Sequence, residues 1–383
     1  MESSAGSTGA DQADAWALLE RNGIDSRWLT TELARAGFAG QITWLEPELV
    51  GTGQVGENVR CRLGWDGAST RGEPDDGGPT VAHPGRPRSV VVKLASANEA
   101  SRAAAEATRT YIREVGFYRD VAPSVAIRVP TAYHVSEDRP ANRFILVMED
   151  IAPADAGNQL AGCTTDQASL AIDAAADLHG STWGRTDLAG LEWIDEPTPT
   201  RTAERVELFR LLYPGFVDRY RQRLDADHLA FGRWLESKFD RWVGARAEPQ
   251  CLVHGDFRLD NMLFGTGSPA PPLTTVDWQT PSLGGGLADV AYFLSGSLDR
   301  QALRDHEAEY LARYRTRLAG HGVELSEAMT WTDYRLSAPA GFVMAVIASQ
   351  LVGQTDRGDD MFMVMAAGSA AQALDLDTAK LID

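Results

Sequence analysis

Two aspartates and an asparagine near the middle of the chain have the types and spacing of a phosphoryl-transfer site. Residues 254–261 read HGDFRLDN, so Asp256 precedes Asn261 by five positions, and Asp277 follows in the segment VDWQ. Phosphoryl transfer needs a group that accepts the proton of the attacking hydroxyl, and oxygen ligands for the metal ions on the phosphates. We expect Asp256 to accept the proton, and Asn261 and Asp277 to be the metal ligands.

The sequence between Asn261 and Asp277 gives a physical reason for this spacing. Residues 261–264 and 273–276 read as short strands, and GTGSPAPP joins them as a turn would. A hairpin formed by these strands would bring Asn261 and Asp277 to the same end, which suits Mg²⁺ because this ion takes few protein oxygens and completes its shell with phosphate and water. Taken singly, each carboxylate is better explained as a solvated loop residue or a helix cap. Only the ordered set favours the site.

A glycine-rich segment lies far upstream of these acids. Residues 51–57 read GTGQVGE and place Gly51, Gly53 and Gly56 in the pattern G-x-G-x-x-G, which both dinucleotide folds and kinases use. A dinucleotide site needs a helix directly after the glycines, whereas here the alternation of residues 59–63 predicts a strand. The segment therefore favours a loop between two strands that covers nucleotide phosphates, and a plain hairpin turn is the alternative.

Lys93 lies within the apolar run VVVKL at residues 90–94. A lysine buried in such a strand without a partner would be costly, so we expect it to bind an anionic group. The alternative is a lysine whose ammonium group reaches solvent along the strand.

The elements that must position these residues change in kind along the chain. Strands are expected at 42–44, 59–63, 90–94 and 144–148, with helices at 13–36 and 98–121. Helices are then expected at 165–179, 203–212, 214–243 and from 289 onward, interrupted by short strands at 251–253 and 273–276. We therefore predict an α+β protein with an N-terminal antiparallel sheet and one main helix in residues 1–148, a flexible insertion at 64–89, and a larger, mostly helical part in residues 149–383.

The motifs together resemble one family. HGDFRLDNMLF and VDWQTPSLGGGLADVAYF are similar to the H-G-D-x-x-x-x-N and D-[FW] segments of the aminoglycoside-phosphotransferase and choline-kinase branch of the protein-kinase-like fold. LHGSTWG at 178–184 and REVGFYRDVA at 113–122 most resemble the ecdysteroid-kinase-like and hydroxyacyl-CoA-kinase-like members. The H-R-D and A-P-E segments of protein kinases are missing, so a protein substrate is disfavoured.

The resemblance implies a bilobal kinase fold that uses ATP and Mg²⁺, and it assigns further residues. Lys93 would contact the α- and β-phosphates and pair with Glu114, although Glu106, two helical turns earlier, is a rival partner. Asp289 would support the catalytic loop. The segment between the lobes, whose backbone would receive the adenine, would contain Met148, Glu149 and Ile151.

The favoured hypothesis is an enzyme that transfers phosphate from ATP to a hydroxyl group of a small molecule. A pseudokinase that binds nucleotide and serves as a scaffold or sensor is the alternative, although no lysine or metal ligand is missing. The acceptor stays open among aminoglycosides, macrolides, steroids, choline-like alcohols and hydroxyacyl-CoA. The acidic run at residues 356–360 would suit a cationic acceptor, but a solvated loop before the last helix is the favoured interpretation.

Composition excludes some partners. The formal net charge of −18 disfavours nucleic acid and anionic membranes, because both would repel the protein. Cys61, Cys163 and Cys251 are too few and too far apart for a disulfide framework, and the first residues lack a basic and an apolar region, so we expect a cytoplasmic protein without a secretory signal. We expect His254 to brace the backbone and His179 to cap or pack a helix.

Overall fold

The computed structural model describes residues 23–51, 56–66, 85–195, 198–245 and 250–383, which form two compact units. The sheet unit consists of the described residues up to Tyr118 together with Pro130–Asp150. The helical unit consists of Arg119–Val129 and Ile151–Asp383. The predicted division into residues 1–148 and 149–383 stays a prediction.

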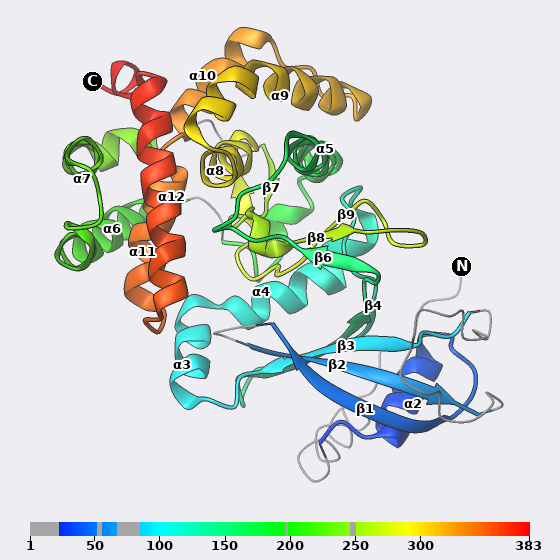
Figure 1. The fold of residues 1–383 in the computed structure, drawn as a ribbon. Coiled ribbons are helices and arrows are strands. Elements are labelled where there is room, and N and C mark those ends of the chain that lie inside the picture. The colour runs from blue at the N-terminus through cyan, green and yellow to red at the C-terminus, as the bar shows by residue number, and fades with distance from the viewer. Residues whose placement is uncertain (1–22, 52–55, 67–84, 196–197, 246–249) are drawn as a thin grey trace. The chain divides into compact units, whose positions relative to one another are not determined.

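The sheet unit is built on five antiparallel strands in the order β1-β2-β3-β5-β4. Figure 1 shows β1, β2 and β3 side by side. Their bounds are β1 Ile42–Val50, β2 Gly56–Trp65, β3 Ser89–Ala95, β4 Ala132–Asp138 and β5 Arg143–Glu149. The antiparallel N-terminal sheet is therefore confirmed. The insertion predicted at 64–89 was drawn too long at both ends, because Trp65 and Ser89 belong to strands. Residues 67–84 of it lie outside the described part.

One face of this sheet packs on helix α2, Ser26–Arg35. Trp28, Leu29 and Leu33 of the helix share a buried cluster with alternate residues of the strands, among them Val90 and Val92. Because side chains alternate along a strand, Lys93 lies on the opposite face of the sheet. The Lys93 side chain therefore lies on the face of β3 that is turned away from the apolar cluster with α2.

The predicted helix at 98–121 is divided in the structure. It consists of α3, Glu99–Thr108, and α4, Thr110–Gly116, separated by Arg109, whose φ of 57° is left-handed. A short π-helix, Phe117–Val121, and a 3₁₀ turn, Ala122–Ser124, follow. The bend redirects the chain between Glu106 on α3 and Glu114 on α4, so these two residues no longer share one helix face.

The helical unit is arranged around α8, Leu287–Ser297, which is buried almost along its whole length (Figure 1). It contacts α5, Thr165–Thr182, α10, Glu327–Ser337, α11, Ala340–Leu351, and α12, Asp356–Asp375. α9, Arg300–Gly320, packs along α5, where Arg313 and Arg317 pair with Asp173 and Asp177. A helix without a polar face must lie inside, which is where the sequence LADVAYFLSGS places α8.

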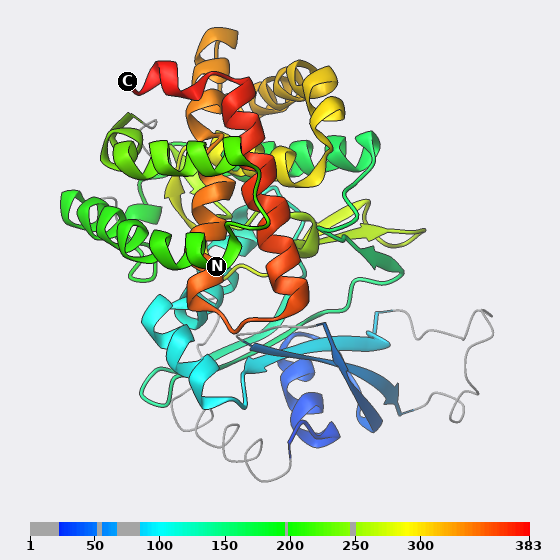
Figure 2. The same cartoon turned by 60° about the vertical axis from the view of Figure 1, so that its left-hand side comes forward.

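Figure 2 shows α6, Pro199–Tyr220, beside α7, Ala226–Ala245, with α11 and α12 next to them. Two helices are present as predicted, but the expected boundary between 203–212 and 214–243 is wrong, since α6 continues through Pro214 and ends at Tyr220. Aromatic packing holds this region, because Phe209 stacks on Phe239 with ring centroids 4.0 Å apart. Tertiary packing therefore outweighs the hydrogen bond that proline removes.

Two small antiparallel sheets complete the helical unit. One has the order β6-β8-β9, with β6 Ala154–Ala156, β8 Met262–Gly265 and β9 Leu273–Thr275. The other pairs β7, Cys251–Val253, with β10, Ser282–Gly284. The short strands join and orient the loops that carry the candidate site. None of the helices that the structure describes has the length and apolar composition needed to cross a bilayer.

Candidate active site

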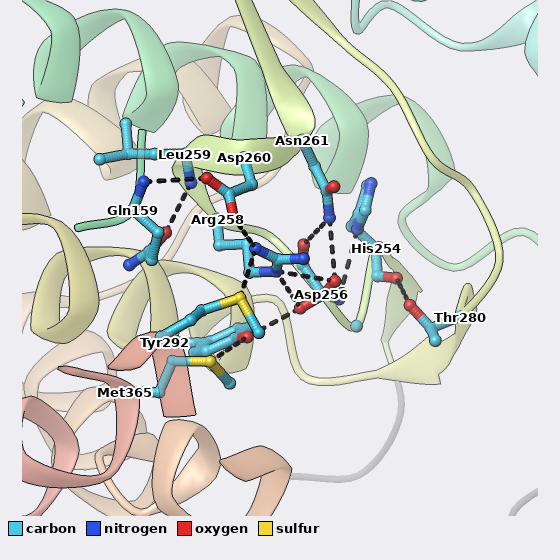
Figure 3. Close-up of polar contacts among 12 residues, drawn as sticks. Gln159, His254, Asp256, Arg258, Leu259, Asp260, Asn261, Thr280, Tyr292 and Met365 are labelled. Atoms are coloured by element: carbon cyan, nitrogen blue, oxygen red, sulfur yellow. Dashed lines mark hydrogen bonds and ion pairs between the residues drawn. The ribbon is translucent and has the colours of Figure 1, made fainter. Parts of the chain in front are cut away.

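The central feature of the helical unit is the catalytic-loop candidate, residues 254–261, which connects β7 to β8 (Figure 3). The predicted hairpin is present, since β8 pairs with β9 and the Val276 amide donates to the Asn261 carbonyl at 2.9 Å. Asp277 is the next residue, so Asn261 and Asp277 leave the hairpin at the same end. The φ of Asp277 is 65°, and a non-glycine residue held there commonly marks a functional site.

Asp256 is surrounded by hydrogen-bond donors. Arg258 Nε lies 3.0 Å from both carboxylate oxygens, the Tyr292 hydroxyl donates to Oδ1 at 2.7 Å, and Asn261 Nδ2 donates to Oδ2 at 2.9 Å (Figure 3). Burial by itself would raise the pKa of Asp256, but the charge of Arg258 and the bond from Tyr292 lower it overall. Asp256 is therefore ionised at neutral pH, and its side chain keeps 22% of its surface exposed.

The Asn261 amide is oriented with its oxygen away from Asp256. Its Nδ2 donates to both the carboxylate and the backbone carbonyl of Asp256, at 2.9 and 2.8 Å. Within the described residues, Asn261 Oδ1 accepts no hydrogen bond, although the residue is buried. An amide oxygen left without a donor in this way fits a magnesium ligand.

The backbone of the loop is hydrogen-bonded to Asp289 of α8. Its carboxylate accepts from the amides of His254 at 2.7 Å and Gly255 at 3.0 Å, as the resemblance implied. His179, at the end of α5, lies 3.2 Å from the same carboxylate through Nε2, and its Nδ1 lies 2.9 Å from the Tyr314 hydroxyl. His179 thus does more than pack a helix, because it belongs to the network that fixes the loop.

His254 braces the loop in the predicted manner. Nε2 lies 3.1 Å from the Val276 carbonyl, and Nδ1 accepts from the Asp256 amide at 3.3 Å, which corresponds to a neutral ring protonated on Nε2. Gly255 has a φ of 80°, and a Cβ there would lie 2.5 Å from the Thr280 carbonyl oxygen. Both the conformation and the close approach require glycine.

A second layer of charges, which the sequence analysis missed, lies behind Asp256. Arg258 also donates to Asp260 at 2.7 Å, and Arg357 at the start of α12 binds the same carboxylate through two bonds of 2.9 and 3.1 Å. Gln159 donates its amide to Asp260 and accepts from the Leu259 amide. Burial would raise the pKa of Asp260, but the bonds from Arg357, Gln159 and Arg258 lower it overall.

Sequence signals exist for some of the missed residues. Arg258 and Asp260 lie inside the loop motif, and Tyr292 follows Asp289 by three positions on one helix, which places both on the same face. Gln159 and Arg357 are distant in sequence and carry no local signal, whereas His179 lies in the LHGSTWG segment, which did not predict its contact with Asp289.

In the sheet unit, the structure pairs Lys93 with Glu114 and not with Glu106. Lys93 Nζ lies 2.6 Å from Glu114 Oε1, and both side chains are buried, whereas Glu106 is exposed on α3. Gly51 ends the β1 side of the glycine segment with a φ of 77°, and Gly56 opens β2. Gly53 lies outside the described residues.

The remaining predicted nucleotide contacts lie where the chain passes from one unit to the other. Met148 and Glu149 end β5, and Ile151 is the first residue of the following segment of the helical unit. Their contact with adenine stays a prediction.

Comparisons with known proteins agree on the fold. A candidate aminoglycoside phosphotransferase from Ralstonia eutropha JMP134 superposes with a TM-score of 0.53 at 17% identity, over 92% of this chain and 98% of that one. Aminoglycoside phosphotransferase APH(2'')-Ib, solved with ADP bound, gives a TM-score of 0.50 at 14% identity, over 94% of this chain and 99% of that one. The predicted protein-kinase-like fold is therefore confirmed.

Sequence comparisons are more specific. The mouse protein Acyl-CoA dehydrogenase family member 10 is 49% identical over 47 residues, which are 12% of this chain and only 4% of that protein. The model of the ecdysteroid kinase-like family matches residues 79–326, more than half of the chain. This match includes the catalytic-loop candidate, Lys93 and Glu114. The chain belongs to the ecdysteroid kinase-like family.

Proposed function

We propose that the protein is an ATP- and Mg²⁺-dependent phosphotransferase that phosphorylates a hydroxyl group of a small molecule. The observation that carries the proposal is the arrangement of Asp256, Asn261 and Asp277. Asp256 and Asn261 are hydrogen-bonded to each other on the loop before β8. Asp277 follows β9, which pairs with β8. This is the layout that positions a hydroxyl and holds metal ions in phosphoryl transfer.

Asp256 orients the acceptor in this proposal. The acceptor hydroxyl would donate to the Asp256 carboxylate while its oxygen forms a bond to the γ-phosphorus, as the bond from that phosphorus to the β,γ-bridging oxygen breaks and ADP leaves. The proton passes to Asp256. Because the pKa of Asp256 is lowered, it is a weak base, which suits a loose transition state where positioning matters more than early deprotonation.

Asn261 and Asp277 would hold the metal. Asn261 Oδ1, which accepts no hydrogen bond from the described residues, and the Asp277 carboxylate after β9 are hard oxygen ligands. Bound there, Mg²⁺ would neutralise negative charge on the phosphates during transfer.

The pair of Lys93 and Glu114 supports nucleotide binding. A buried ammonium group held in place by a carboxylate is a fixed positive charge of the kind that binds phosphate oxygens. The ADP found in APH(2'')-Ib, which has the same fold, agrees with an adenine nucleotide. The net charge of −18 makes such local positive groups necessary.

The acceptor class stays open, and the acidic run at 356–360 gives little support to a cationic acceptor. The run is the first turn of α12 and not a loop. Asp359 accepts from Tyr220 and Gln354, and Asp360 pairs with Arg223. Carboxylates already bonded in this way are poor ligands for an amine.

A screen for ADP release tests the function. Purified protein with Mg²⁺ and ATP is offered aminoglycosides, macrolides, steroids, choline-like alcohols and hydroxyacyl-CoA, and products are examined by mass spectrometry for an added phosphate. We expect one class to be phosphorylated by the wild type and not by Asp277→Ala. Nucleotide binding without turnover across the whole panel would instead favour the pseudokinase.

A further inference from the structure

A small polar pocket lies in the helical unit between the glycine segment before α8 and helices α9 and α10. It is lined by Trp183, Gln250, Gly285, Gly286, Leu287, Tyr314, Leu325, Asp333 and Ser337. Its inner space, about 20 Å³, is room for one occupant of the size of a water molecule. None of these residues belongs to the proposed phosphoryl-transfer machinery.

Two polar side chains of α10 line this pocket without partners. Ser337 is 7% exposed, and its hydroxyl forms no hydrogen bond with any residue that the structure describes. Asp333, one helical turn earlier, forms no hydrogen bond or ion pair within the same residues, and burial raises its pKa. Ser337 is buried and Asp333 is half-buried, so a hydroxyl and a carboxylate without a protein partner among the described residues face the same pocket and offer oxygen ligands to an occupant.

Tyr314 adds a further oxygen at the same wall. A Cβ on Gly286 would lie 2.5 Å from the Tyr314 hydroxyl and 2.7 Å from His179 Nδ1, so the hydroxyl lies against the pocket's glycine segment. With His179 Nε2–H donating to Asp289, Nδ1 accepts the Tyr314 proton. The tyrosine oxygen therefore keeps its lone pairs for another donor or a cation.

We propose that this pocket binds one small monovalent cation, such as K⁺ or NH₄⁺. Its lining offers a carboxylate and hydroxyl oxygens, which attract a cation and repel an anion. The space matches an ion about the size of water. A single carboxylate is too little negative charge for a dedicated calcium site, which takes six to eight oxygens, several of them carboxylates.

The pocket is linked to the catalytic loop through hydrogen bonds. Tyr314 contacts His179, His179 contacts Asp289, and Asp289 holds the amides of His254 and Gly255. A cation beside Tyr314 would favour the orientation in which the tyrosine donates to His179. The site therefore stabilises the fold around the loop without contacting the acceptor or the nucleotide.

The first experiment measures thermal unfolding of the full chain in chloride salts of K⁺, NH₄⁺, Na⁺ and N-methyl-D-glucamine at equal ionic strength. We expect K⁺ or NH₄⁺ to raise Tm saturably, by about 2–4 °C at ten times the dissociation constant. Asp333→Asn should lose most of this shift. Asp218→Asn, the same change at an exposed position on α6, should keep it. Equal melting of the wild type in all four salts would overturn the proposal.

A second measurement does not depend on the variant's folding. ²⁰⁵Tl⁺ serves as a probe for K⁺, and its NMR line should broaden saturably in the presence of wild-type protein and sharpen when K⁺ is added. Absence of a saturable, K⁺-competed effect would contradict the site, as would an unchanged effect in a folded Asp333→Asn variant.

Discussion

At the scale of single residues, Asp256 is defined by the donors around it. Arg258, Tyr292 and Asn261 fix both carboxylate oxygens, so the side chain is held in one orientation before any ligand arrives. Preorganisation of this kind lowers the cost of aligning the attacking hydroxyl. It also means that losing one donor should harm turnover more than it harms nucleotide binding.

Tyr292→Phe tests this consequence. The change removes the 2.7 Å bond to Asp256 Oδ1 and keeps the buried ring, so the fold should persist. We expect kcat to fall about tenfold, the effect of losing one hydrogen bond to a charged group, while the nucleotide dissociation constant stays the same. Steady-state kinetics and nucleotide titration check both values.

Tyr310→Phe is the matched control, because its hydroxyl donates only a 3.5 Å bond to the Thr165 carbonyl, far from Asp256 in the hydrogen-bond network. Equal losses of kcat in the two variants would show that Tyr292 has no special relation to Asp256.

At the scale of elements, the segment before α8 depends on Gly286. A Cβ there would lie 2.5 Å from the Tyr314 hydroxyl and within 2.8 Å of the His179 ring, both of which are buried. Gly286→Ala should therefore destabilise the helical unit by about 1–3 kcal/mol and speed amide exchange at His254 and Gly255.

Gly244→Ala in α7 is the control for that variant. Beyond its own helix and chain neighbours, no atom of the described residues lies within 4 Å of the new Cβ, so this change should be neutral or slightly stabilising. Urea unfolding and hydrogen exchange measure both effects, and unchanged exchange at the loop in Gly286→Ala would contradict the role given to the glycine.

A second element-scale prediction concerns Glu32, which joins α2 to β4. Its carboxylate lies 2.8 Å from His134 Nδ1 and also accepts from Arg35. Burial would raise the pKa of Glu32, but the bonds and charges of His134 and Arg35 lower it overall. A lowered folded pKa means that the stabilisation is fully present above the ordinary glutamate value and is lost as the pH falls through the folded pKa.

Glu32→Gln should accordingly cost about 1–3 kcal/mol near pH 6, and the difference from the wild type should shrink as the pH is lowered towards 3. The free energy of unfolding, followed by exchange of β4 amides, measures the difference at each pH. A difference that is constant with pH would show that the charge of Glu32 contributes nothing.

At the same scale, sequence patterns predicted the elements with strong periodicity and missed those without it. The apolar run at residues 90–94 predicted β3, and the turn-like residues after Phe264 predicted the hairpin of β8 and β9. β4 was missed because its sequence AYHVSED is largely polar. The division of the helix at Arg109 was missed because a left-handed arginine has no sequence signature.

At the scale of the whole molecule, the candidate site could be predicted only where its residues are close in sequence. Asp256, Asn261 and Asp277 were found from spacing. Among their supports, His254 and Asp289 were expected, but the contacts of Gln159 and His179 were not, because Gln159 and Leu259 are 100 positions apart, and His179 and Asp289 are 110 positions apart. Contacts of this kind depend on how α5, α8 and α12 pack, which periodicity does not specify.

The overall acidity is not explained by the ion pairs between helices. Asp173 and Asp177 pair with Arg313 and Arg317, so these pairs add nothing to the net charge of −18. Such pairs stabilise the helical unit modestly and select no acceptor. The net charge therefore disfavours nucleic acid and anionic membranes as partners and does not identify the acceptor.

The central claim is that Asp256 orients the hydroxyl that attacks ATP. Its most direct test is kcat of Asp256→Asn beside the wild type and Asp218→Asn, with the acceptor that the screen identifies. We predict that Asp256→Asn lowers kcat about 10²–10⁴-fold while its affinity for the nucleotide stays the same, and that Asp218→Asn changes neither. Wild-type turnover by Asp256→Asn would contradict the claim.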